Sequence, residues 1–127
     1  MNYFSVLRKL FPMARKVYKD KNRFKSVVDE SMRKSNKVDL FKEISHELRL
    51  VFGLLKDYRR GNYRNIKKKD IFLMLAALLY LLNPADIIPD FIIGVGFVDD
   101  LSVLAYIIKK LKDELEKYRI WKENARS

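Results

Sequence analysis

The chain has 127 residues, of which 49% are hydrophobic and 34% charged, and this balance is typical of a single globular domain. It has no cysteine and one histidine, which excludes a disulfide framework, a thiol nucleophile and a thiolate zinc site. Residues 1–69 contain 20 basic and 7 acidic residues, for a net charge of +13, whereas residues 70–127 carry −2. With only 4 glycines and 3 prolines, we expect one all-α domain over residues 1–127, with an anionic partner for its basic half.

The first segment, residues 3–18, has the apolar spacing of an amphipathic helix. Pro12 lies inside this pattern and cannot donate to the helical ladder, so we expect a kink, or two short helices that meet near Phe11. The other face is basic, and its candidate membrane or anion contacts are Arg8, Lys9, Arg15, Lys16 and Lys19. This pattern fits a helix on an anionic membrane surface, but it fits equally well an apolar stripe that packs on the core.

Two further helices are expected in the basic half. A weaker amphipathic stretch begins at Asn22, which we interpret as its N-cap. The clearest pattern predicts a helix over residues 39–60, with Asp39 as its cap and Gly61 as its terminator. His46 falls on the polar side of that helix, so we interpret it as a solvated surface residue and not as a catalytic one.

The second half is expected to form an apolar hairpin. After a polar, basic connector over residues 62–69, residues 71–82 are all apolar. A helix of this length spans about 18 Å, short of the ~30 Å hydrocarbon core of a bilayer, which favours a central core helix. The last helix is expected over residues 98–120. We therefore predict a compact helical bundle, in which basic amphipathic helices cover a central two-helix hairpin.

A turn rich in proline and aspartate joins the two apolar helices. Asn83 can cap a short helix, Pro84 suits its first position, and Asp86 can accept hydrogen bonds from free backbone amides. Pro89 disfavours helical geometry in the residue before it, and the glycines permit backbone angles that other residues resist. The candidate structural residues of this turn are Asn83, Pro84, Asp86, Pro89, Asp90, Gly94, Gly96, Asp99 and Asp100.

This turn resembles the signature of a known family. The residues that carry the resemblance are Tyr80, Asn83-Pro84-x-Asp86-x-Ile88-Pro89-Asp90-Phe91, Gly96 and Asp99-Asp100. Together they resemble the YkvA-like family, a small bacterial helical domain of unknown function, over about residues 71–108. The resemblance implies a two-helix hairpin around the turn and an association with membranes. It implies no reaction, substrate or catalytic residue.

The turn aspartates also leave a divalent-cation site open as an alternative, because hard metals prefer several oxygen ligands. Asp99 and Asp100 are neighbours on a helix and diverge by about 100°, so one of them at most is expected to aim at a shared point. We favour helix capping and pairing with basic residues, and we assign no metal ligand and no cofactor. The sequence has no nucleophile constellation, phosphate loop or cofactor fingerprint, so we predict a non-enzymatic protein without a small-molecule substrate.

The expected function is peripheral association with the cytoplasmic face of the membrane through the basic amphipathic helices. Residues 1–19 interleave basic and apolar side chains, so no signal peptide is expected and the protein is predicted to be cytoplasmic. Insertion of residues 71–108 would place four aspartates deep in hydrocarbon, at a cost of several kcal/mol. Two other classes stay open: a nucleic-acid-binding module, which the charge alone would permit, and a module that docks a protein partner.

Overall fold

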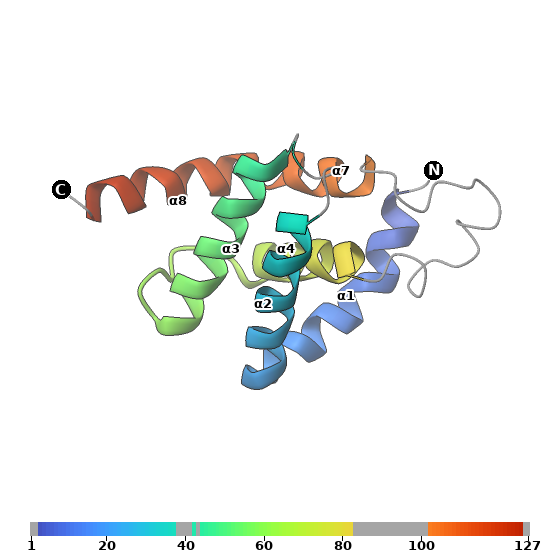
Figure 1. The fold of residues 1–127 in the computed structure, drawn as a ribbon. Helices are drawn as coiled ribbons and strands as arrows, with labels where there is room; N and C mark the ends of the chain where they lie inside the picture. Colours follow the sequence, from blue (N-terminus) through green and yellow to red (C-terminus); the bar gives the residue numbers. More distant parts are fainter. Residues whose placement is uncertain (1–2, 38–41, 43, 83–101, 126–127) are drawn as a thin grey trace.

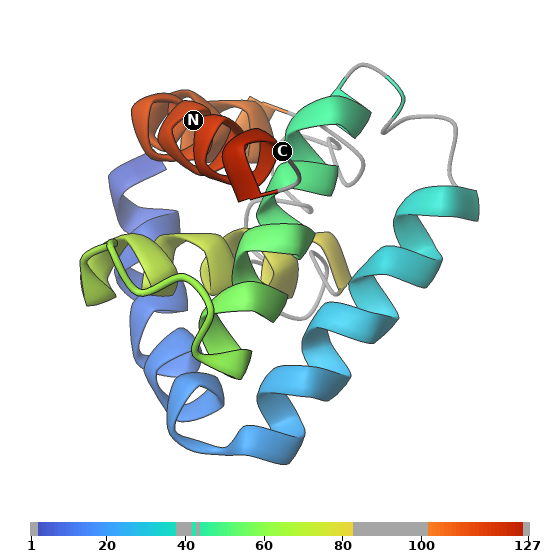
Figure 2. The same cartoon turned by 90° about the vertical axis from the view of Figure 1, so that its left-hand side faces the viewer.

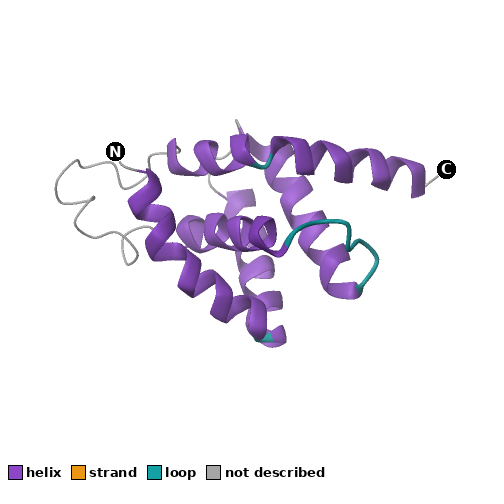
Figure 3. Ribbon diagram, turned by 180° about the vertical axis from the view of Figure 1, so that it is seen from behind, coloured by secondary structure: helices purple, strands orange, loops and turns teal. Residues whose placement is uncertain are grey.

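The computed structural model describes residues 3–37, 42, 44–82 and 102–125. These residues form six helices and no strand, which confirms the all-α class (Figures 1 and 3). The helices are α1 (Tyr3–Lys19), α2 (Lys21–Lys37), α3 (Ser45–Arg60), α4 (Lys68–Leu82), α7 (Ser102–Lys110) and α8 (Lys112–Ala125). The predicted cap Asp39, the predicted turn and the predicted start of the last helix at residue 98 lie outside the described residues.

Helix α4 is the centre of the fold. It contacts α1, α2, α3 and α7 and runs through the middle of the bundle (Figures 1 and 2). Ile71 and all residues from Leu73 to Leu81 are buried. A helix that is apolar on every side must be covered on every side, and the four neighbouring helices provide that cover. The prediction of a central core helix is therefore confirmed.

Helix α1 is one continuous helix that contains Pro12, so the alternative of two short helices is wrong. Proline removes one backbone donor, but Leu10 and Ala14 on either side of it are fully buried and hold both halves on the core. Val17 is buried as well. The apolar stripe of α1 thus packs on the core, which was the second of the two interpretations left open.

Asp20, and not Asn22, caps the start of α2. Its Oδ1 accepts hydrogen bonds from the backbone amides of Asn22 at 3.1 Å and Arg23 at 3.2 Å. These are the N2 and N3 amides that an N-cap side chain satisfies. The predicted cap was two residues late because α2 begins directly after a one-residue joint with α1, so the first residue with a capping side chain takes the role.

Gly61 ends α3 as predicted. It has a left-handed backbone with φ of 84°, and its amide donates to the carbonyl oxygen of Tyr58 at 3.1 Å. The amide of Asn62 donates to the carbonyl oxygen of Asp57 at 2.9 Å. This pair of bonds is a Schellman motif, which requires the left-handed residue that glycine supplies without strain.

The predicted last helix is observed as two successive helices, α7 and α8, which lie end to end. The amide of Leu111 donates to the carbonyl oxygens of Ile107 at 3.1 Å and Ile108 at 3.0 Å, and the carbonyl of Leu111 accepts from Leu115 at 2.9 Å. Helical hydrogen bonding therefore continues through the junction between α7 and α8. Figure 2 is viewed along these two helices, with α8 in front of α7. Helix α7 contacts α4, and α8 contacts α3.

One basic residue of the first half binds the C-terminal end of α4. Lys34, near the end of α2, donates from Nζ to the carbonyl oxygen of Leu82 at 3.1 Å. Leu82 is the last residue of α4, and the last turn of α4 contains no basic residue of its own. A cation at this end stabilises the negative pole of the helix and satisfies one of its free carbonyls.

Candidate anion-binding surface

The five basic residues predicted on the first helix are all exposed. Arg8, Lys9, Arg15, Lys16 and Lys19 lie on the sides of α1 that the buried apolar stripe leaves to solvent. The helix has no acidic residue along its whole length. Its outer side therefore presents positive charge without an internal counterion from the same helix.

Two of these five residues, Arg8 and Arg15, line a groove between α1, α4 and α7. The groove has a volume of about 500 Å³. Its apolar part is formed by Leu7, Phe11, Pro12 and Leu73, and its basic part by Arg8, Arg15, Lys69 and Lys110. We call this site the α1 groove. Lys9, Lys16 and Lys19 do not line it. The groove combines an apolar floor with four cations, and the residues that line it include no acid.

A second cavity lies where the C-terminal ends of α1 and α3 meet the start of α2. Figures 1 and 2 both place these helix ends at the lower end of the molecule. The cavity has a volume of about 450 Å³, and we call it the tyrosine cup. It is lined by Tyr18, Lys21, Phe24, Tyr58, Arg59 and Arg64. No acidic residue is among them.

Two phenol groups form one wall of the tyrosine cup. The hydroxyls of Tyr18 and Tyr58 are hydrogen bonded to each other at 2.8 Å. The guanidinium carbon of Arg64 lies 4.5 Å from the centroid of the Tyr58 ring, and the rings of Tyr18 and Phe72 form a T-shaped pair with their centroids 5.2 Å apart. The hydrogen bond with Tyr58 and burial both raise the pKa of Tyr18, while the positive charge of Arg64 lowers it by less. Tyr18 is therefore a neutral phenol near pH 7.

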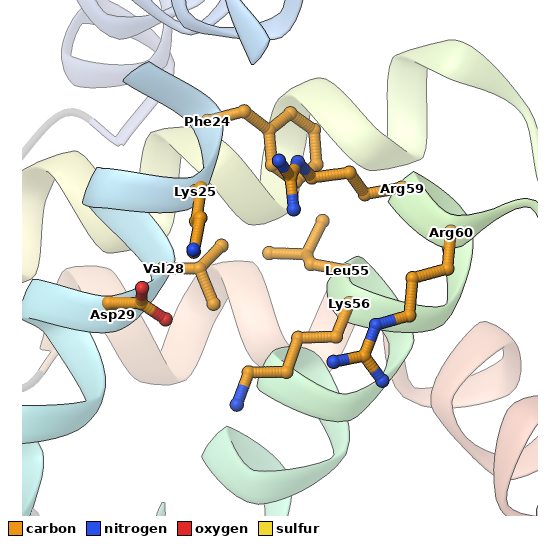
Figure 4. Close-up of a pocket in the computed structure, with 8 residues that line it drawn as sticks. All are labelled: Phe24, Lys25, Val28, Asp29, Leu55, Lys56, Arg59 and Arg60. Atoms are coloured by element: carbon orange, nitrogen blue, oxygen red, sulfur yellow. The ribbon is translucent and has the colours of Figure 1, made fainter. Parts of the chain in front are cut away.

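A smaller hollow of about 110 Å³ continues along the seam between α2 and α3 (Figure 4). It shares Phe24 and Arg59 with the tyrosine cup. Lys56 and Arg60 extend from α3 at its lower side, and Asp29 presents a carboxylate from α2. Lys56 and Arg60 thus extend the positive surface from the tyrosine cup along the contact between α2 and α3, and Asp29 is the one acid among the described residues that line this hollow.

The remaining predicted site residues are those of the turn, and they lie outside the described residues, as does the cation alternative that depends on them. Within the described ranges, no cluster of three or more histidine, cysteine or acidic residues could hold a metal ion. His46 is exposed, as predicted.

Comparison with known proteins identifies the family. Residues 70–106 match a family model described as "Protein of unknown function (DUF1232)". The chain is 41% identical over 81 residues to the "Uncharacterized membrane protein YkvA" of Bacillus subtilis (strain 168), a match that spans 64% of this chain and 76% of that protein. This chain belongs to the YkvA family. The resemblance inferred from the turn is thereby confirmed, and the matched model covers most of α4, the turn and part of α7 of this YkvA-family protein.

A second relative is the "E3 ubiquitin-protein ligase RNF170" of Xenopus laevis, which is 35% identical over 72 residues. The match covers 56% of this YkvA-family chain and 26% of the ligase, so this chain corresponds to about a quarter of that protein. No solved structure gives a significant match. Among the helices of the described ranges, none is both long enough and apolar enough to span a bilayer.

The tyrosine cup was not predicted from the sequence. Lys21, Arg59 and Arg64 are single cations in a sequence rich in lysine and arginine, so nothing local distinguishes them. Tyr18 and Tyr58 end two separate apolar patterns, and they meet only because α1 and α3 both pack against α2 and α4. The one available signal was that each tyrosine stands at a helix end next to basic residues.

Proposed function

We propose that this protein binds peripherally to an anionic membrane surface at the cytoplasmic face, through the exposed basic side of α1. The observation that carries the proposal is the α1 groove, in which apolar side chains such as Phe11 lie among Arg15, Lys69 and Lys110. Cations near an anionic bilayer contribute about 1 kcal/mol each, and an apolar floor can accept part of a lipid chain. The name of the Bacillus subtilis relative as a membrane protein supports the same function.

The apolar contribution in this proposal is confined to the groove. Leu10, Ala14 and Val17 are buried against the core, so they are not available to lipid. Leu7 and Phe11 are only partly buried and belong to the groove. Membrane binding would therefore combine strong electrostatic attraction with shallow apolar contact.

Vesicle flotation tests this function. The wild type is compared with the groove variant R15Q/K69Q/K110Q and with the control variant R33Q/R49Q/K112Q, which removes the same charge from exposed positions on α2, α3 and α8. At low salt the wild type and the control should float with anionic vesicles, and the groove variant should partition about 100-fold less. Binding to neutral vesicles should be weak in all three.

Two outcomes would contradict the proposal. The first is a wild type that stays at the bottom of anionic gradients at low salt. The second is an equal loss in the groove and control variants, which would mean that net charge alone matters. A wild type that never floats but binds duplex DNA in the same buffer would favour the nucleic-acid alternative.

In the same proposal the turn fixes the hairpin and serves as a docking surface for a protein partner, and the protein acts without catalysis or cofactor. Helices α4 and α7, which the turn connects, pack against each other, as the two helices of a hairpin would. If Asp86 and Asp99 cap helices, D86A and D99A should each lower the melting temperature. Unchanged melting temperatures in both variants would argue instead that these carboxylates serve binding.

A further inference from the structure

We propose that the tyrosine cup binds a phosphate monoester group. This inference goes beyond membrane association, because the cup is a separate cavity from the α1 groove and its ligand could be a lipid headgroup or a soluble phosphate. The shared chemistry is a tetrahedral oxyanion that carries between one and two negative charges near pH 7.

The charge of the cup favours an anionic ligand. Lys21, Arg59 and Arg64 line it, and none of the three forms an ion pair with another described residue. Two acids adjoin lining residues in the sequence, and both have other partners: Asp57 accepts hydrogen bonds from Tyr118 and Lys122, and Asp20 accepts from the backbone amides that begin α2. Three cations without a carboxylate in one concave site attract an anion, and planar guanidinium groups suit phosphate oxygens.

The tyrosine pair also keeps a hydrogen-bond donor for a ligand. In the pair formed by Tyr18 and Tyr58, one hydroxyl donates to the other, and the hydroxyl that accepts keeps its own proton for a further acceptor. A phosphate oxygen is such an acceptor. The wall of the cup therefore supplies a neutral donor beside the three cations.

Aromatic contacts hold the binding groups of the cup in place before a ligand binds. The ring of Tyr58 carries the Arg64 guanidinium on its face, and the Phe72 ring fixes the orientation of Tyr18. Groups that are already oriented lose less conformational entropy when a ligand binds. The smaller hollow of Figure 4 is a weaker candidate, because Asp29 lies on it and its volume is about a quarter of that of the cup.

An NMR titration with inorganic phosphate, against sodium chloride of equal ionic strength, tests the inference. The full chain is compared with K21Q/R64Q and with R33Q/R49Q, which lose the same charge, and all four positions are exposed. Wild type and R33Q/R49Q should show saturating shifts of the Arg64 and tyrosine ring signals, with a dissociation constant about tenfold lower than that of K21Q/R64Q. No phosphate-specific shift in the wild type, or equal affinity in all three proteins, would overturn the inference.

A vesicle arm identifies the source of the phosphate. Flotation is measured with phosphatidate, which carries a monoester, and with phosphatidylglycerol, which carries a diester, at equal surface charge. A preference for phosphatidate that K21Q/R64Q loses supports a lipid headgroup, whereas phosphate-specific shifts without that preference support a soluble phosphate.

The groove variant R15Q/K69Q/K110Q separates this inference from the proposed function. It should keep the phosphate affinity of the wild type even though it loses flotation. A groove variant that loses both would contradict the independence of the two sites.

Discussion

The hydroxyl of Tyr118 on α8 donates a 2.6 Å hydrogen bond to Oδ2 of Asp57 on α3. Nζ of Lys122 lies 3.1 Å from the same oxygen, and Nδ2 of Asn62 lies 3.5 Å from Oδ1. Asp57 is only 5% exposed. Burial by itself raises the pKa of its carboxyl, but the hydrogen bonds from Tyr118, Lys122 and Asn62 outweigh it, and the pKa lies below its ordinary value. This buried carboxylate joins α3 to α8.

We expect D57N to be less stable than the wild type by about 1–3 kcal/mol at pH 7, because an amide accepts weaker hydrogen bonds and leaves Lys122 without its charge partner. Since the pKa of Asp57 is lower in the folded than in the unfolded protein, its contribution is complete above the unfolded pKa of about 3.9 and is lost as pH falls through the folded value. Urea denaturation between pH 3 and 7 measures both effects. The difference in the free energy of unfolding between the wild type and D57N should shrink below about pH 4. A difference that stays constant with pH would contradict the stabilising role of the Asp57 carboxylate.

Gly53 makes room for the Tyr118 hydroxyl. A Cβ at position 53 would lie 2.8 Å from that oxygen. We expect G53A to destabilise the protein by about 1 kcal/mol or more. In a helix without such an obstruction, replacing glycine with alanine stabilises the helix by about 0.5–1 kcal/mol. In the Y118F background the oxygen is gone and the remaining contacts are ordinary at 3.5 Å, so G53A should be neutral or stabilising there. A double-mutant cycle from thermal unfolding tests this, and additive effects would argue against the contact.

Gly61 tests the backbone argument without a steric contribution. A Cβ there would meet nothing within 4 Å, so the cost of G61A arises from its φ of 84° alone. We expect G61A to lose about 1 kcal/mol of stability, and G61N to lose less, because asparagine tolerates the left-handed region better. Chemical denaturation of both variants measures the difference. Equal losses would mean that the Schellman motif does not depend on this conformation.

The start of α2 provides a matched pair of variants. D20A removes the side chain that accepts from two backbone amides and should cost about 1 kcal/mol, whereas N22A should change stability by less than about 0.5 kcal/mol. Thermal melts compare the two directly. A larger loss of stability in N22A than in D20A would mean that Asn22 caps α2, as the sequence predicted.

Much of the fold follows from local sequence. The unbroken apolar stretch of α4 predicts a helix that must be enclosed, and Gly61 predicts the end of α3, because both depend on backbone geometry and hydration within a few residues. The residues of the turn were also sufficient for the family resemblance. The errors concern positions where two local solutions compete, as with Asp20 and Asn22 for the same cap.

The sequence by itself determined the helical class, the core helix α4, the family and the basic character of the first half. Only the tertiary structure decided that the apolar face of α1 packs on the core, that Asp57 meets Tyr118, and that Tyr18 and Tyr58 form one wall of a basic cup. Helical periodicity shows which side chains share a face, but it contains no information on the neighbour that the face meets. That choice depends on how helices far apart in the chain pack together, and the sites of this protein are formed at those contacts.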